Sequence, residues 1–92
     1  MLQKLSVNQL GDTTCVKIYD PEKKKLIAVF ENCWKAGNKM GVTGAAIQNA
    51  CSRRGRTYSP ILEMEVAPRL ASIKEGDKER IKHCNKKILL NE

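Results

Sequence analysis

The sequence has few of the residues from which catalytic and metal sites are built. It contains one histidine, and no glycine-rich segment carries paired carboxylates. Its four cysteines, Cys15, Cys33, Cys51 and Cys84, are scattered, whereas zinc ligands usually come in pairs about two to four residues apart. His83 beside Cys84 is the only adjacent pair of such ligands. We therefore expect a protein that is not an enzyme, binds no metal or cofactor, and keeps its cysteines as free thiols.

Aromatic residues and long apolar runs are also scarce. Aromatics make up 4% of the chain and hydrophobic residues 41%, which is enough for a modest core. The first ten residues, MLQKLSVNQL, are too short and too polar for a signal peptide, and no later run is long enough to span a membrane. The 92 residues therefore predict one intracellular domain, located in the cytoplasm and without a membrane partner.

Acidic residues are missing from the middle of the chain. The net charge is +7 and the pI is about 9.4, which favours a polyanionic partner. Between Asn32 and Tyr58 there is no acid, but there are five basic residues, namely Lys35, Lys39, Arg53, Arg54 and Arg56. Such a concentrated basic segment is typical of nucleic-acid-binding proteins. The alternative is a solvated basic face that only maintains solubility.

The N-terminal third predicts an arm followed by a β-hairpin. Residues 1–14 show little periodicity and are expected to form a flexible arm. Residues 15–19 alternate between apolar and polar side chains, as a half-buried strand does. Asp20 and Pro21 supply turn chemistry, and residues 26–30 are an apolar strand, so the hairpin spans residues 15–31.

The segment from Asn32 to Ser52 predicts a helix-turn-helix. Asn32 is a suitable N-cap for a helix over Cys33–Met40, and Gly41 suits the left-handed residue that ends it. Thr43 then caps a second helix that runs to about Arg54. The buried faces are expected to consist of Cys33, Ala36, Gly37 and Met40 in the first helix and of Ala46, Ile47, Ala50 and Cys51 in the second.

Weaker patterns follow the second helix. Gly55 is a natural stop for it. Tyr58–Val66 alternates and predicts a third strand, which Pro68 ends. Asp77 caps a short amphipathic helix whose apolar stripe is Ile81, Cys84 and Ile88. The expected fold is therefore α+β, with a β-hairpin, a helix-turn-helix, a third strand and a short C-terminal helix. Its domain spans residues 15–70, with a helical tail over 71–92.

The outward face of the second helix is the candidate binding surface. If Ile47 points inward, the outward residues are Thr43, Gly44, Ala45, Gln48, Asn49 and Ser52. Glutamine and asparagine can pair bidentately with adenine, and the methyl groups of threonine and alanine can contact thymine. The residues expected to contact bases are Thr43, Ala45, Gln48, Asn49 and Ser52. Those expected to contact the DNA backbone are Lys39, Arg53, Arg54 and Arg56. Ordinary exposed helix surface remains the alternative for Gln48 and Asn49.

The only tryptophan and the run of three lysines each have both a structural and a functional interpretation. Trp34, the only tryptophan, is able to stack on a base, but its place beside an apolar strand favours a core anchor against the sheet. Lys23, Lys24 and Lys25 are able to reach phosphates from the hairpin tip, but a solvated turn is the more frequent role of such a run.

The block VKIYDPEKKKLIAVFENCWKAGNKMGVTGAAIQNACSRRGRTY resembles the nuclease-associated modular DNA-binding domain found beside homing endonucleases of phages and other mobile elements. The matching positions are Val16–Asp20, Phe30, Asn32, Ala36, Met40–Val42 and Ile47, and the block covers about half of the chain. Gly37 replaces a usual alanine, and Asn32 a usual serine. The resemblance implies sequence-directed DNA binding through the helix-turn-helix, with the hairpin as support.

These observations predict a non-enzymatic protein that binds double-stranded DNA. No nuclease module accompanies the motif, so we expect a small regulator or accessory protein of a phage or mobile element, or a relative with another use. The main alternative is a protein-interaction module, such as a virion component, an inhibitor or an assembly adaptor, which keeps the fold without reading DNA. RNA binding is less favoured because a surface row of aromatics is lacking. The oligomeric state stays open.

Overall fold

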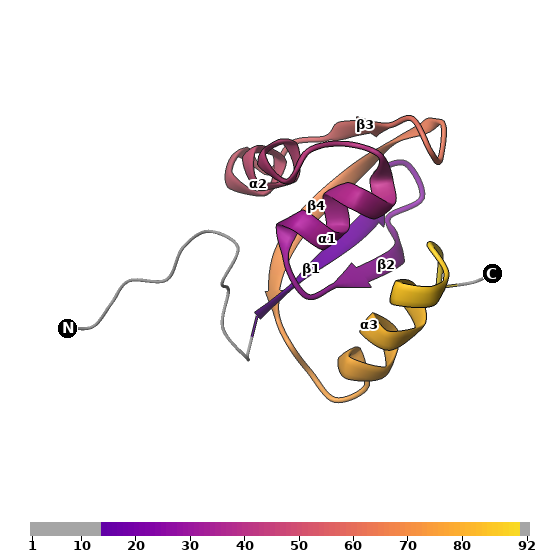
Figure 1. Ribbon diagram of the computed structural model, residues 1–92. Helices are drawn as coiled ribbons and strands as arrows, with labels where there is room; N and C mark the ends of the chain where they lie inside the picture. The colour runs from indigo at the N-terminus through magenta and orange to yellow at the C-terminus, as the bar shows by residue number, and fades with distance from the viewer. Residues whose placement is uncertain (1–13, 91–92) are drawn as a thin grey trace.

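The computed structural model describes residues 14–90, which form a four-stranded sheet and three helices (Figure 1). The strands are β1 (Thr14–Asp20), β2 (Lys25–Phe30), β3 (Thr57–Ser59) and β4 (Met64–Ser72), and the helices are α1 (Cys33–Met40), α2 (Gly44–Arg53) and α3 (Asp77–Lys86). The antiparallel strands lie in the order β2-β1-β4-β3. The α+β class is confirmed. Residues 1–13 of the expected arm lie outside the described residues.

The predicted hairpin is present as β1 and β2. Its turn is held by Asp20, whose carboxylate accepts hydrogen bonds from the backbone N–H of Glu22 at 2.9 Å and of Lys23 at 3.2 Å. The backbone N–H of Lys24 donates to the carbonyl of Asp20 at 2.7 Å, and Lys24 adopts a left-handed φ of 55°. All these bonds join residues close together in the chain, which is why the turn can be predicted from the sequence.

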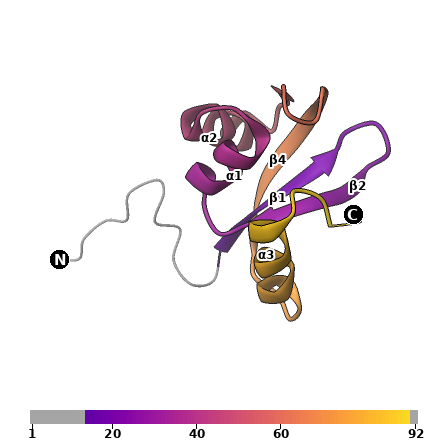
Figure 2. The same cartoon turned by 45° about the vertical axis from the view of Figure 1, so that its right-hand side comes forward.

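The two faces of the sheet carry different layers. Val16 and Phe30 belong to the larger apolar cluster, which α1 and α2 complete, whereas their neighbours Cys15 and Val29 belong to a smaller cluster with Ile81 of α3. Helix α3 lies along the edge of β2 and takes part in both clusters, because its Ile81 belongs to the smaller cluster and its Cys84 to the larger one. Figures 1 and 2 show α1 and α2 side by side, with α3 at the other end of the molecule.

The segment that contains α3 also covers the free edge of β2. The backbone N–H of Val29 donates to the sulfur of Cys84 at 3.4 Å, and the N–H of Leu90 donates to the carbonyl of Ile27 at 2.8 Å. Edge strands expose unpaired polar groups, and these two contacts satisfy one donor and one acceptor of β2.

The single strand predicted over Tyr58–Val66 is wrong, because two strands occupy this region. The reason is the buried Ser59, whose hydroxyl donates to the carbonyl of Met40 at 2.6 Å and accepts from the N–H of Leu62 at 3.1 Å. The chain therefore turns after β3, and Glu63 takes a left-handed φ of 58° before β4 begins. The turn is closed locally by the bonds from Leu62 and Glu63 to Ser59, with Pro60 inside it, and the contact with Met40 anchors it to α1.

The prediction that Pro68 ends the strand is also wrong. Pro68 lies inside β4, opposite Ile18 of β1, and the strand continues to Ser72. The β3 ladder ends where Thr57 faces Val66, so one side of β4 is unpaired beyond that point. A residue without an N–H group is tolerated at such an open edge.

The C-terminal helix is present, with a shorter apolar stripe than predicted. Ile81 and Cys84 are buried, but Ile88 lies beyond the end of α3 and packs half-buried against the larger cluster. Gly76, rather than Asp77, is the N-cap. Since α3 packs against β2 and β4 extends past residue 70, residues 71–90 share the core of residues 15–70.

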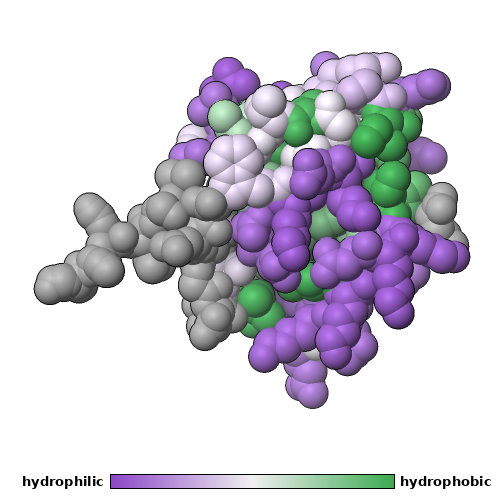
Figure 3. Space-filling view, in the orientation of Figure 1, coloured by the Kyte–Doolittle hydropathy of each residue, from purple (hydrophilic) through white to green (hydrophobic). Residues whose placement is uncertain are grey.

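The surface is polar around α3 and more apolar near β3. Figure 3 shows hydrophilic residues over the lower right of the molecule and hydrophobic ones near the turn between β3 and β4. Ile61 of that turn is half exposed, and so are Trp34, Tyr58 and Leu70.

Candidate nucleic-acid interface

The two helices and the turn between them follow the local signals in the sequence. The side chain of Asn32 accepts a hydrogen bond from the N–H of Lys35 at 2.9 Å, and the hydroxyl of Thr43 accepts one from the N–H of Ala46 at 3.0 Å. Each cap satisfies one free donor of a helix start. Gly41 ends α1 with a left-handed φ of 81°, so the predicted caps and the turn glycine are confirmed.

Close packing of the turn on α1 requires a residue without a side chain. A Cβ atom at Gly37 would lie 2.7 Å from the carbonyl oxygen of Val42, closer than non-bonded atoms approach. Ile47 is fully buried in the cluster that contains Ala36 and Met40. The predicted burial of Ile47 is therefore confirmed, whereas the close approach at Gly37 is to the turn between the helices.

The predicted base-contacting residues share one side of α2. Thr43, Ala45, Asn49 and Ser52 are exposed, and Gln48 is half-buried. Ile47 and Ala50 are buried on the opposite side. The surface is formed by small and amide-bearing side chains without an acidic group, so it is able to approach another molecule closely.

The prediction that Gly44 points outward is wrong, and so is the prediction that Trp34 anchors α1 to the sheet. Cys33 already occupies the inward position at the start of α1, and Trp34 points away from the core, with 48% of it exposed. Its ring lies against Gly44, which is buried, and a Cβ atom there would be 2.2 Å from the ring. An aromatic side chain thus borders the N-terminus of α2.

Three of the four predicted backbone-contacting residues lie at the end of α2. Arg53, Arg54 and Arg56 are all exposed. Arg54, not Gly55, is the left-handed residue that ends the helix, with φ 52°. The guanidinium of Arg56 lies 3.5 Å from the carboxylate of Glu65 in β4. The tertiary fold therefore brings an acid to a segment whose own sequence has none.

Lys39 lies apart from these arginines. It is half-buried in the last turn of α1, and its ammonium group donates to the carbonyl of Asn85 at 3.1 Å. This carbonyl is near the C-terminus of α3, where the helix dipole favours a cation. Lys39 connects two helices instead of extending the surface of α2.

Arg69 of β4 is a residue that sequence reasoning missed. Its guanidinium donates to the carbonyls of Arg54 at 2.9 Å, Gly55 at 2.9 Å and Pro68 at 2.6 Å. It thereby holds the end of α2 against the sheet and supplies positive charge at the negative end of the helix dipole. No local signal identifies its contact with Gly55, because 14 positions separate the two residues.

A pair of thiols joins the two helices of the motif. Cys33 begins α1 and Cys51 lies in the last turns of α2, and the Cys51 thiol donates a hydrogen bond to the sulfur of Cys33. This bond lowers the pKa of Cys33, and it raises the pKa of Cys51 well above its ordinary value, with burial adding to the rise. The predicted inward orientation of both is consistent with a buried Cys33 and a half-buried Cys51.

Comparisons of the chain with protein-family models, with curated proteins and with solved structures find no match. Within residues 14–90, no helix has the length and apolar character needed to cross a bilayer. In the same part of the chain, no three side chains among His, Cys, Asp and Glu gather as metal ligands. Function is therefore inferred from the surface and the charges of the helix-turn-helix.

Proposed function

We propose that the protein binds double-stranded DNA, without catalysing a reaction, by placing α2 in the major groove. The observation that carries this proposal is the composition of one surface. Exposed small and amide side chains along α2 lead directly to three exposed arginines, and the sequence contains no acid from Asn32 to Leu62. Helix-turn-helix proteins present their second helix to the groove in this way.

Base edges would be contacted by the side chains of α2. The exposed amide of Asn49 suits a bidentate contact with adenine, and Gln48, although half-buried, lies beside it. The methyl groups of Thr43 and Ala45 suit thymine, and Ser52 is able to donate to or accept from a base. The small residues at the start of α2 let the helix approach the duplex closely.

Phosphates would be contacted by Arg53 and Arg54, with a weaker contribution from Arg56. Among residues 14–90, the guanidinium groups of Arg53 and Arg54 have no ion-pair partner, whereas Arg56 shares its charge with Glu65. Lys39 is left out of this set because its ammonium group already binds the Asn85 carbonyl. Cations at these positions would displace counterions from the DNA backbone.

The resemblance to the modular DNA-binding domain of homing endonucleases supports a biological setting. We propose a small regulator or accessory protein of a phage or mobile element that acts on DNA in the cytoplasm of the host cell. An interaction module that turns the same basic surface toward an acidic protein is the competing proposal, and DNA-binding measurements distinguish the two.

The salt dependence of duplex binding tests the role of the arginines. In a variant with Arg53→Ala, Arg54→Gly and Arg56→Ala, we expect the slope of log K against log salt to fall by about one unit for each phosphate that is no longer neutralised. Glycine is used at position 54 because the backbone there is left-handed. The variant Lys78→Ala, Lys82→Ala, Lys86→Ala removes the same charge from exposed sites on α3 and should leave the slope much closer to that of the wild type.

A second variant is expected to tighten duplex binding instead of weakening it. Glu65→Gln removes the carboxylate that lies beside Arg56, so duplex binding should become tighter at low salt. A wild-type protein without affinity for duplex DNA at low salt would overturn the proposal. So would an arginine variant that binds as tightly as the wild type, and the interaction module would then be the better explanation.

Sequence discrimination tests the contacts with base edges. Replacing Gln48 and Asn49 by alanine should reduce the preference for the best duplex site over a scrambled one, by about 1–3 kcal/mol for each bidentate contact. The preferred site is first selected from random duplexes. Asn85→Ala, which removes an exposed amide from α3, serves as the control. Unchanged discrimination in both variants would remove direct readout by these two residues.

A further inference from the structure

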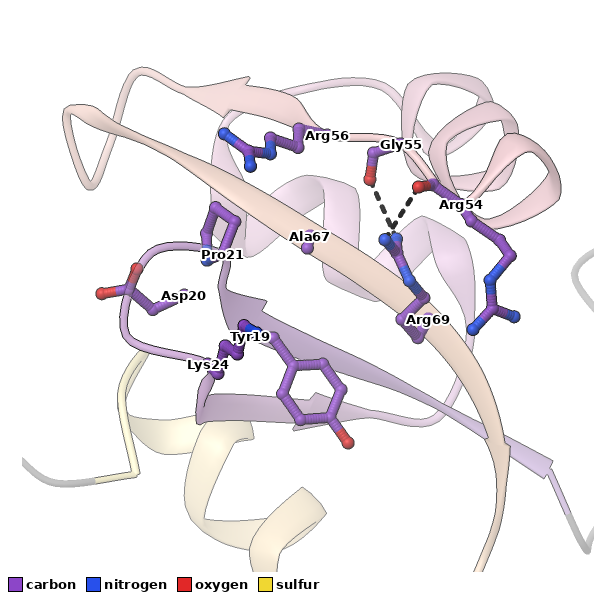
Figure 4. A pocket seen from close by; sticks show the side chains of 9 residues that line it. All are labelled: Tyr19, Asp20, Pro21, Lys24, Arg54, Gly55, Arg56, Ala67 and Arg69. Carbon is purple, nitrogen blue, oxygen red and sulfur yellow. Dashed lines mark hydrogen bonds between the residues drawn. The ribbon is translucent and has the colours of Figure 1, made fainter.

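A cleft of about 520 Å³ lies between the β1–β2 turn and the end of α2 (Figure 4). Its lining comes from three separate parts of the chain. The hairpin contributes Tyr19, Asp20 and Lys24, the segment after α2 contributes Arg54 and Arg56, and β4 contributes Arg69. The cleft therefore exists only in the folded protein, and the surface of α2 that faces the proposed DNA groove does not include it.

The side chains around the cleft make it a site for an anion. Four of them are cationic, and Asp20 is the only acid in the lining. The carboxylate of Asp20 accepts two backbone hydrogen bonds in the turn, and in Figure 4 it points away from Arg54 and Arg69. The carboxylate keeps its negative charge, but four cations in the lining outnumber it, so the cleft carries net positive charge.

Two of the four cationic side chains, those of Lys24 and Arg54, form no ion pair or hydrogen bond with the described residues. Arg56 lies near Glu65, and Arg69 donates to three carbonyl groups. Within residues 14–90, the side chains of Lys24 and Arg54 have neither an ion-pair partner nor a hydrogen bond. Lys24 belongs to the hairpin turn and Arg54 to the end of α2, and both line the cleft.

Both residues occupy backbone positions that favour glycine. Lys24 has φ 55° and Arg54 has φ 52°, and these are two of the three non-glycine residues with positive φ in the described part of the chain. A long side chain at a left-handed position costs backbone energy that glycine avoids. Strained positions of this kind concentrate at binding sites, where the side chain itself is needed.

Arg69 offsets the partial negative charge at the C-terminal end of α2, which would otherwise repel an anion in the cleft. The C-terminus of a helix carries partial negative charge on its free carbonyl groups and would repel a phosphate. Figure 4 shows the guanidinium of Arg69 reaching from β4 to the carbonyls of Arg54 and Gly55. The carbonyls are thereby bound to a cation at the wall of the cleft. Beside them, the small residue Ala67 leaves room next to Tyr19, to which it is paired across the strands.

We propose that this cleft binds a phosphate group through Lys24, Arg54 and the hydroxyl of Tyr19. The inference builds on the proposed function, and in the DNA complex the group is a backbone phosphodiester beyond the end of α2. The contact with DNA then extends from the helix-turn-helix onto the β1–β2 hairpin. The hairpin is a binding element in addition to a support for the helices.

The variant Lys24→Gly tests the cleft without endangering the fold. It removes the ammonium group at a position where glycine relieves backbone strain, so loss of folding does not explain a loss of binding. Lys82→Ala removes one charge from an exposed site on α3 and is the matched control. Tyr19→Phe removes only a hydroxyl group. Binding is measured to a duplex across a salt series, and to inorganic pyrophosphate by titration calorimetry.

In duplex binding, Lys24→Gly should lower the salt slope by about one unit and weaken affinity roughly five- to tenfold at about 0.1 M salt. Tyr19→Phe should weaken affinity at an unchanged slope, because no charge is removed. Lys82→Ala should behave as the wild type does. If the wild type binds duplex and Lys24→Gly matches Lys82→Ala, the cleft is not a phosphate site, and the proposed DNA-binding function stands.

The pyrophosphate titration separates failure of the cleft from failure of the proposed function. If the wild type ignores duplex DNA but binds pyrophosphate, and Lys24→Gly abolishes that binding, the cleft is a site for a small phosphate ligand and the DNA-binding function is wrong. If the wild type binds neither probe, both proposals are overturned.

Discussion

At the scale of single residues, Asp77 is a fully buried charge with several partners. Its side chain is fully buried at the start of α3, 2.7 Å from the guanidinium of Arg80 and 3.4 Å from the ammonium of Lys17 in β1. It also accepts a hydrogen bond from the N–H of Lys74 at 2.8 Å. Burial by itself raises the pKa of the Asp77 carboxyl, but the hydrogen bonds and the two cations outweigh burial and hold this pKa below its ordinary value.

The lowered pKa of Asp77 predicts how stability depends on pH. A carboxyl group whose pKa is lower in the folded than in the unfolded state stabilises the fold fully above its unfolded pKa of about 4. This stabilisation disappears as the pH falls through the folded pKa. Asp77→Asn should therefore cost on the order of 1–3 kcal/mol at neutral pH, with the difference from the wild type shrinking below about pH 4.

Urea unfolding of wild type and variant across a pH series measures this difference in stability. Glu75→Gln, at an exposed acid in the loop before α3, is the control and should differ little from the wild type at any pH. A difference for Asp77→Asn that stays constant down to strongly acidic pH would contradict an ionised Asp77 in the fold.

At the scale of secondary-structure elements, the packing of α1, α2 and the turn between them depends on two glycines in different ways. A Cβ atom at Gly37 meets the backbone carbonyl of Val42, which the turn holds in place. A Cβ atom at Gly44 meets the ring of Trp34, which is half exposed and free to swing outward. Replacing glycine by alanine should therefore lower the stability of the fold more at position 37 than at position 44.

Gly37→Ala should destabilise the fold by about 1–3 kcal/mol, although alanine is the better helix former. Gly44→Ala should cost less and should shift the fluorescence of Trp34, the only tryptophan, as its ring moves into water. Thermal unfolding and emission spectra measure both effects. A Gly37→Ala variant as stable as the wild type would show that the turn can move away from α1.

Local signals account for the elements that were predicted well. The caps at Asn32 and Thr43 and the hairpin turn at Asp20 are each held by bonds between residues a few positions apart. The division of the third strand into β3 and β4 was missed although Pro60 and the bonds from Leu62 and Glu63 to Ser59 are local. Only the anchoring of this turn, by the hydroxyl of Ser59 to Met40, spans 19 positions. An alternating pattern alone does not contain that contact.

At the scale of the whole molecule, the core protects all four cysteines. Cys15, Cys33 and Cys84 are buried, and burial raises the pKa of the Cys15 and Cys84 thiols. Cys51 is half-buried, and its pKa is raised by the hydrogen bond to Cys33 and by burial. The thiolate is the reactive form, so the accessible cysteine is also one whose pKa is raised.

Alkylation of the native protein by iodoacetamide at mildly alkaline pH should therefore be slow at every cysteine. Unfolding in urea should release all four thiols together, as mass spectrometry would show. Cys33→Ser replaces the sulfur to which Cys51 is bonded, so it should speed the alkylation of Cys51. Rapid labelling of Cys51 in the native wild-type protein would contradict the hydrogen-bonded pair.

The hairpin, the two helices of the motif and the basic character of their surface all follow from the amino-acid sequence alone. These features depend on caps, a turn glycine and periodicity, and each involves residues close together in the chain. The short range of these interactions is what makes them recognisable in a single sequence.

Which charged side chains are free to bind a partner, in contrast, depends on tertiary contacts. Folding places Glu65 beside Arg56, joins Lys39 to α3, and brings Arg69 to the end of α2. It also assembles the cleft from the hairpin, α2 and β4, and leaves Trp34 at the surface. Each of these contacts joins residues from different elements. Such residues meet only after the strands have paired and the core has packed, and no local sequence pattern encodes that.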